Sequence, residues 1–229
     1  MTNLAQTHPL FVQANHGALK NAKVKTLQNR ALIPSGVSPL ILGNQNRPYR
    51  QDFQEIRKLK VINVDAIAFL EQIPGLFDVI ILDFPDPHSI ELAKLYSKGF
   101  YHLLKKHLSP RGLFIQQSTS PIFAKEAFLS IGRTIESANF NTLPIHQNVP
   151  TFGEWGFWIA GRQEEWNPDQ LKTKLQSISA LPSKLKFLTP ELTQNLMHFG
   201  KGQLLTHEAK ITTISQAAVY DYYLEGWLQ

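Results

Sequence analysis

Short apolar runs and amphipathic stretches alternate along the middle of this chain, which predicts strands and helices in turn. The clearest run, residues 78–83 (DVIILD), is almost continuously apolar, as is typical of a strand buried on both faces of a parallel sheet. Over residues 90–108, apolar positions recur at helical spacing, and 109–112 (SPRG) is predicted to be a turn. The same pattern predicts strands at 60–63, 112–117, 143–146 and 156–161, and helices at 66–72 and 124–138. This alternation indicates an α/β layered fold.

Two regions depart from this pattern. Residues 1–22 are predicted to form a short helix and a turn, and residues 23–58 are polar and interrupted by Pro and Gly, which predicts a long loop or insertion. From residue 163 the chain becomes polar, partly helical and finally rich in aromatic residues. We therefore expect an α/β domain over 1–162 and a C-terminal extension over 163–229 that packs on it.

Composition and charge exclude several classes of protein. The chain of 229 residues contains no cysteine, which rules out disulfides, cysteine-ligated zinc and a thiol nucleophile. Its net charge of +5 comes from residues 1–60, where basic residues are scattered among Gln, Asn and Pro. This favours a solvated segment over a nucleic-acid footprint, which needs a basic stripe with stacking aromatics. An apolar run of about 20 residues and a signal-peptide pattern are both absent, so the cytoplasm is the expected compartment.

The sharpest candidate for chemistry is Asp83-Phe84-Pro85-Asp86-Pro87, where the strand at 78–83 ends. Ligands of open parallel sheets bind at the carboxyl ends of the strands. The prolines stiffen the loop and hold Asp86 near Asp83, and two close carboxylates can attract a cation and leave one suited to act as a general base. The alternative is that Asp83 caps the next turn and Asp86 is an ordinary turn residue.

Three further segments are candidates for the same edge. Asp65 follows the strand at 60–63 and either accepts hydrogen bonds from an adenine amine or caps the next helix. Residues 116–121 (QQSTSP) either line the cleft or cap the helix at 124–138. In 151–157 (TFGEWGF), the aromatic residues either wall a pocket, with Glu154 facing a cation, or pack in the core. Metal-binding HExxH, GxSxG, Walker and GxGxxG motifs are all missing.

Several of these segments, in a fixed order, resemble the polyamine aminopropyltransferases (spermidine synthases), most closely their membrane-anchored bacterial branch. The resemblance is strong over residues 60–161 and moderate in the tail. The matching segments are VINVDAIAFL (61–70), FDVIILDFPDP (77–87), KLYSKGFYHLLKKHLSPRGLFIQQSTSP (94–121), VPTFGEWGFWIAG (149–161), KFLTPEL (186–192) and VYDYYLEGW (219–227).

The resemblance implies a Rossmann-like, methyltransferase-type fold that serves spermidine biosynthesis. The family transfers an aminopropyl group from decarboxylated S-adenosylmethionine, a co-substrate, to the polyamine putrescine; it implies no resident cofactor or metal. By position, Asp83 corresponds to the general base and Asp86 to a residue of the substrate pocket. Asp65, with Ala66 beside it, corresponds to the acid that binds the adenine amine. Tyr96, Gln117 and Glu154 are expected at the substrate, where Glu154 compensates for a Tyr hydroxyl that Phe152 lacks.

The sequence also departs from the family pattern. The family's first strand, its glycine-rich loop and the acidic residue expected on the ribose are missing, so we expect an N-terminally truncated domain whose anchored relatives carry membrane helices upstream. Without the first strand, the edge of the strand at 78–83 is left unpaired. We therefore predict that the isolated chain is poorly soluble or needs a partner.

Two other functions remain open. One is a methyltransferase of the same fold, which the Asp83/Asp86 pair disfavours. The other is a catalytically inactive remnant that serves a full-length homologue as a regulatory or structural subunit, which the missing glycine loop favours. The sequence leaves open the acceptor amine and whether the chain forms a homo-oligomer.

Overall fold

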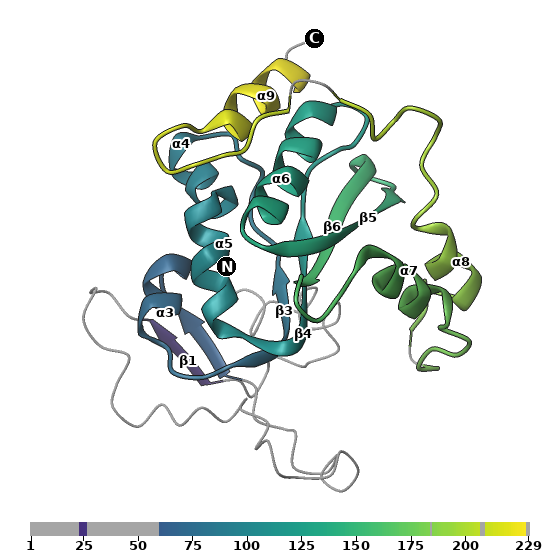
Figure 1. Cartoon of the computed structure of the whole chain (residues 1–229), viewed down its shortest axis with the longest axis horizontal. Helices are drawn as coiled ribbons and strands as arrows, with labels where there is room; N and C mark the ends of the chain where they lie inside the picture. The colour runs from purple at the N-terminus through teal and green to yellow at the C-terminus, as the bar shows by residue number, and fades with distance from the viewer. Residues whose placement is uncertain (1–22, 27–59, 184, 207–208, 228–229) are drawn as a thin grey trace, which may run out of the picture. The chain divides into compact units, whose positions relative to one another are not determined.

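The computed structural model describes residues 23–26, 60–183, 185–206 and 209–227 (Figure 1). The chain divides into two compact units, Met1–Pro74 and Gly75–Gln229. No helix of the described residues is both long and apolar enough to cross a membrane.

The described part of the first unit is a pair of parallel strands followed by a helix. Strand β1 (Lys23–Thr26) pairs with β2 (Lys60–Asn63), and helix α3 spans Ala66–Gln72. The predicted strand and helix at 60–72 are confirmed. The prediction of a loop over 23–58 is wrong at 23–26, because pairing with a distant strand, which local polarity does not reveal, makes this segment extended. The rest of that region and the helix predicted within 1–22 lie outside the described residues.

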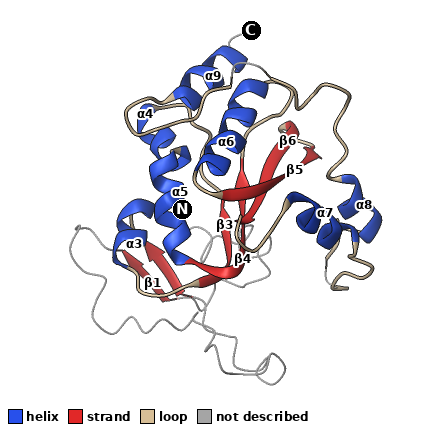
Figure 2. Cartoon of the chain, viewed as in Figure 1, coloured by secondary structure: helices blue, strands red, loops and turns tan. Residues whose placement is uncertain are grey.

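The second unit is built on a mixed sheet of β3 (Phe77–Leu82), β4 (Leu108–Gln117), β5 (Phe140–Val149) and β6 (Gly153–Arg162), in the order β3-β4-β6-β5 (Figure 2). β3 runs parallel to β4, and β6 is antiparallel to both of its neighbours. The parallel pair brings the carboxyl ends of β3 and β4 to one edge. The predicted α/β class is confirmed.

Helices cover the two faces of this sheet unequally. On one face lie α5 (Lys98–His107) and α6 (Lys125–Ser137), and the Trp158 indole of β6 donates to the Phe128 carbonyl of α6 at 3.0 Å. On the other face, α7 (Pro168–Gln176) and α8 (Pro190–Asn195) lie near β5, where Leu171 packs with Leu143 and Ile145. The last helix, α9 (Ala218–Trp227), packs on α6.

Two predicted elements differ in detail. The helix expected over 90–108 is α4 (Ile90–Ala93), a 3₁₀ turn (Lys94–Tyr96) and α5, because Ser97 is extended and its hydroxyl accepts from the Phe100 amide to start α5 anew. The turn expected at 109–112 lies inside β4. There the register against β3 shifts: Phe77 faces Leu108 but Val79 faces Leu113, so the extra residues bulge out of the ladder.

The strand β3 is not buried on both faces, contrary to the prediction. Val79 and Ile81 are 67% and 72% exposed, whereas Leu82, on the opposite face, is buried. Within the described residues β3 ends the order of its sheet, with β4 as its neighbour. α5 and α6 shield only the other face of the sheet.

Candidate active site

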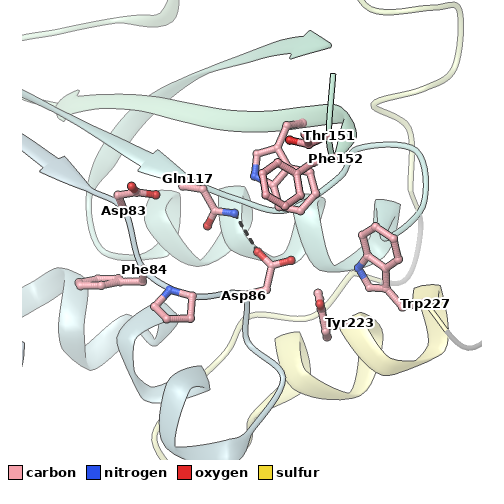
Figure 3. Close-up of a pocket in the computed structure, with 10 residues that line it drawn as sticks. Asp83, Phe84, Asp86, Gln117, Thr151, Phe152, Tyr223 and Trp227 are labelled. Atoms are coloured by element: carbon pink, nitrogen blue, oxygen red, sulfur yellow. Dashed lines mark hydrogen bonds between the residues drawn. The ribbon is translucent and has the colours of Figure 1, made fainter. Parts of the chain in front are cut away.

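An open pocket of about 560 Å³ lies at the carboxyl ends of β3 and β4 (Figure 3). The loop after β3, the end of β4, the turn between β5 and β6, and α9 all contribute to its wall. The lining residues are Asp83, Phe84, Pro85, Asp86, Gln117, Thr151, Phe152, Trp155, Tyr223 and Trp227. The predicted site residues Asp83, Asp86 and Gln117 are therefore brought together.

Both oxygens of the Asp86 carboxylate accept hydrogen bonds. Gln117 Nε2 donates to Oδ1 at 2.8 Å, as Figure 3 shows, and Thr119 Oγ1 donates to Oδ2 at 3.0 Å. Tyr223 lies on the pocket side of the same carboxylate (Figure 3). Burial, the charge of Asp86 and a hydrogen bond to it raise the pKa of Tyr223 to about 12. Asp86 is thus held in one orientation by neutral donors.

Asp83 has a different environment. It follows the last residue of β3, it is exposed, and it lines the pocket. None of the described residues donates a hydrogen bond to its carboxylate. Of the two acids, Asp83 is therefore the one whose oxygens are available to take a proton from a ligand.

Tyr96 supports the pocket from behind. Its fully buried side chain donates to the Pro85 carbonyl at 2.9 Å and lies 3.3 Å from Gln117 Oε1. Burial, with the charges of Asp86 and Asp83, raises the pKa of Tyr96 well above its usual value, so the hydroxyl remains a donor. Tyr96 is thus not among the residues that line the pocket, and its predicted contact with the substrate stays a prediction.

Backbone strain accompanies the Thr119 contact. Thr119 has a φ of 56°, a left-handed conformation that costs a β-branched residue about 1–3 kcal/mol. Two backbone hydrogen bonds hold it: the Ser118 amide donates to the Gly156 carbonyl at 2.9 Å, and the Gly156 amide donates to the Thr119 carbonyl at 2.7 Å. The conformation aims the hydroxyl of a fully buried residue at Asp86.

Aromatic rings form the remainder of the wall. Phe152 and Trp155 come from the turn and start of β6, and their ring centroids lie 5.4 Å apart. Trp227 of α9 lies 6.4 Å from the Trp155 ring and 6.2 Å from that of Tyr223. Aromatic faces attract cations, and their surface also accommodates methylene groups. Rings beside two carboxylates suit an elongated ligand with an ammonium group.

Glu154, like Tyr96, is not among the residues that line this pocket. Glu154 points elsewhere: its carboxylate pairs with His146 Nδ1 of β5, while His146 Nε2 lies 2.7 Å from the His198 carbonyl. The neighbouring strand thus supplies a partner for this carboxylate, and the expectation that Glu154 lies at the substrate stays a prediction. In the first unit, Asp65 caps α3, which begins at Ala66, by accepting from the Ala68 amide at 2.9 Å. The capping role is confirmed; the adenine-binding role of Asp65 and Ala66 stays a prediction.

Sequence reasoning did not assign roles to Thr119, Tyr223 or Trp227. The two aromatic residues carried a usable signal, because a spacing of four positions would place their side chains on one face of a helix. No sequence pattern marks Thr119, because its left-handed backbone conformation arises from pairing with Gly156.

Comparison with known proteins identifies similar sequences. The model of the spermine/spermidine synthase domain matches residues 49–174. The polyamine aminopropyltransferase of Oceanobacillus iheyensis is 40% identical over 215 residues, which cover 91% of this chain and 40% of that protein. The corresponding protein of Leptospira interrogans is 38% identical over 170 residues, which cover 74% of this chain and 32% of that protein. The chain thus spans two fifths or less of the length of these relatives.

Among solved structures, spermidine synthase from Thermotoga maritima is similar with a TM-score of 0.49 and 20% identity, over 66% of this chain and 50% of that one. A spermidine synthase in complex with the transition-state analogue AdoDATO has a TM-score of 0.48, at the same identity and coverage. The family match over 49–174 contains Asp83, Asp86 and Gln117, whereas Tyr223 and Trp227 lie beyond it.

Proposed function

Because this chain belongs to the spermine/spermidine synthase family, we propose that its pocket binds a polyamine acceptor for aminopropyl transfer from decarboxylated S-adenosylmethionine. One observation carries the proposal: two carboxylates, Asp83 and Asp86, share one pocket with the rings of Trp155, Tyr223 and Trp227. A diamine such as putrescine is a dication of linked methylenes near neutral pH. Carboxylates and ring faces match its ends and its chain respectively.

In the proposed reaction, Asp83 is the general base. One ammonium group of the acceptor gives its proton to the Asp83 carboxylate and becomes a nucleophilic amine. The nitrogen lone pair attacks the aminopropyl carbon bonded to sulfur, the C–S bond breaks, and its electron pair returns to sulfur. The sulfonium becomes the neutral thioether methylthioadenosine, and the acceptor becomes a longer polyamine. Asp86 and the rings hold the acceptor in line with this carbon.

The same charges disfavour the methyltransferase alternative. S-adenosylmethionine carries its own carboxylate, which Asp83 and Asp86 would repel, whereas the decarboxylated donor lacks it. The acidic pocket also matches a cationic acceptor better than a neutral one. The proposal therefore includes decarboxylated S-adenosylmethionine as the aminopropyl donor. It also includes putrescine, in the cytoplasm, as the acceptor.

The test is turnover of the purified chain with 1,4-diaminobutane and decarboxylated S-adenosylmethionine, followed as methylthioadenosine released. We expect Asp83→Asn to lower kcat roughly 100- to 10,000-fold, since a general base contributes about that much. Asp78→Asn is the matched control, because Asp78 accepts from Ser109 at 2.7 Å and does not line the pocket. The melting temperature of each variant shows whether it is folded.

The outcomes separate the three functions. Methylation of an acceptor with S-adenosylmethionine in place of polyamine formation would establish the methyltransferase. Diamine binding without turnover by the wild-type chain would exclude catalysis by this chain alone and favour the non-catalytic subunit. In that case, we expect the chain to co-purify with a longer homologue.

A further inference from the structure

The aromatic wall of the pocket and the acidic loop meet at Asp86, and both are connected to one buried residue, Thr212. The Thr212 side chain is fully buried. The amide, the hydroxyl and the carbonyl of Thr212 each make a hydrogen bond of 2.9 Å. The amide of Thr212 donates to Thr134 Oγ1 in α6, its hydroxyl accepts from the Val219 amide, and its carbonyl accepts from the Lys98 amide. Thr212 thus links α5, α6 and α9.

The first series of contacts runs from Thr212 through α9 to the aromatic wall of the pocket. Val219 is the second residue of α9, and the amides of a helix's first turn have no partner within the helix. The Thr212 hydroxyl supplies that partner and so fixes where α9 begins. One and two turns further on, Tyr223 and Trp227 lie on the same helix face and line the pocket.

The second series of contacts runs from Thr212 through the start of α5 to the acidic loop. Lys98 is the first residue of α5, and Ser97 caps this helix. Tyr96, directly before Ser97, donates to the Pro85 carbonyl and lies within hydrogen-bond reach of Gln117. Gln117 in turn donates to Asp86.

Since both series of contacts end at Asp86, we propose that Thr212 is a positioning residue that sets the distance between the aromatic wall and the acidic loop. The inference rests on the proposed function, because it concerns the acceptor end of that pocket. Thr212 is not among the residues that line the pocket, and it acts through Tyr96 and Tyr223. Its loss loosens α9 against Asp86 and weakens acceptor binding, while Asp83, directly after β3, keeps its place for the proton transfer.

The experiment compares Thr212→Val, which removes the hydroxyl, with Thr212→Ser, which keeps it. Thr193→Val is the matched control: Thr193 is a buried threonine of α8 whose hydroxyl donates to the Thr189 carbonyl at 2.9 Å. KM for 1,4-diaminobutane, KM for the aminopropyl donor, kcat and melting temperature are measured for each. Hydrogen exchange is followed in peptides that cover 218–227.

For Thr212→Val we expect the diamine KM to rise roughly fivefold, the order of effect of one lost hydrogen bond. Donor KM and kcat stay within about twofold, and residues 218–227 exchange faster. Thr212→Ser and Thr193→Val keep the wild-type diamine KM. An unchanged diamine KM and unchanged exchange in folded Thr212→Val would overturn the proposal, as would an equal rise in the KM of both substrates.

Two further measurements test the role of Thr212 if a variant does not fold or if the wild-type chain shows no turnover. If Thr212→Val does not fold, the Val219 amide of the wild-type chain is measured by NMR. Protection comparable to that of core amides supports the link, and exchange at the rate of a frayed helix end refutes it. If the wild-type chain shows no turnover, the proposed function fails, while exchange and direct binding of 1,4-diaminobutane still decide the role of Thr212.

Discussion

At the scale of the residue, the Tyr223 hydroxyl and the Asp86 carboxylate stabilise each other in a pH-dependent way. Tyr223 has a pKa raised from 10.0 to about 12, chiefly by burial and then by Asp86. Its contribution to stability is therefore fully present below pH 10, where Tyr is protonated in both states, and is lost as pH rises through about 12. We expect Tyr223→Phe to be less stable than wild type below pH 10, with the difference shrinking between pH 10 and 12.

Urea unfolding of both proteins from pH 8 to 12 measures this difference directly. Tyr220→Phe serves as the control, since Tyr220 is on the same helix and does not line the pocket. A gap between wild type and Tyr223→Phe that stays constant across this range would contradict the assignment.

Single residues of the pocket were predictable where chain direction alone placed them. Asp83 and Asp86 follow β3, and Gln117 ends the adjacent parallel strand β4, so that all three lie at the carboxyl ends of neighbouring strands. Glu154 lies opposite Asn148 in the strand register, and its pairing with the His146 side chain runs diagonally across the two strands, which local pattern does not reveal.

At the scale of the element, the position of α9 depends on a close approach to the start of α6. A Cβ on Gly226 would lie 2.6 Å from the Phe123 carbonyl oxygen and 2.7 Å from the Ala124 Cα, both of them backbone atoms. We expect Gly226→Ala to push α9 outward, to destabilise the chain by about 1–3 kcal/mol, and to change the Trp fluorescence through Trp227.

Gly99→Ala is the matched control for this helix glycine. The nearest atom to a Cβ there is Ile214 Cδ1 at 3.1 Å, the end of an exposed and flexible side chain. Because alanine favours helix by about 1 kcal/mol over glycine, this variant should be neutral or more stable in thermal melts. Equal stability of both variants would show that α9 does not need the glycine contact.

Most elements were predictable from periodicity, and the exceptions share a cause. The helix α3 was predicted over its observed bounds because Asp65 and Pro74 mark its ends and apolar spacing marks its buried face. The strand β1 and the break at Ser97 were missed. The first depends on pairing with residues far along the chain, and the second on a serine that caps a new helix inside an apolar periodic stretch.

At the scale of the whole molecule, apolar surface on β3 governs how the isolated chain behaves. Val79 and Ile81 expose about two thirds or more of their surface on adjacent positions of one face. Exposed apolar strands at a sheet edge favour association. We expect the purified chain to self-associate at high concentration, and Val79→Thr with Ile81→Thr to reduce light scattering while keeping strand propensity.

Ile80→Thr provides the contrast, because Ile80 lies on the opposite face and pairs with Phe114, which is buried. This change should lower the melting temperature without improving solubility. A wild-type chain that stays monomeric at high concentration and melts cooperatively would contradict the predicted association.

Sequence pattern was enough to assign the α/β class, the family and the acidic loop, because periodicity and motif order can be read without coordinates. The contact of Tyr96 with the Pro85 carbonyl, the pairing of Glu154 with His146 and the strained backbone of Thr119 became visible only in the folded chain. Folding also brought Tyr223 and Trp227 from the end of the chain to Asp86. The geometry of these contacts follows from strand register and helix packing, which no local pattern encodes.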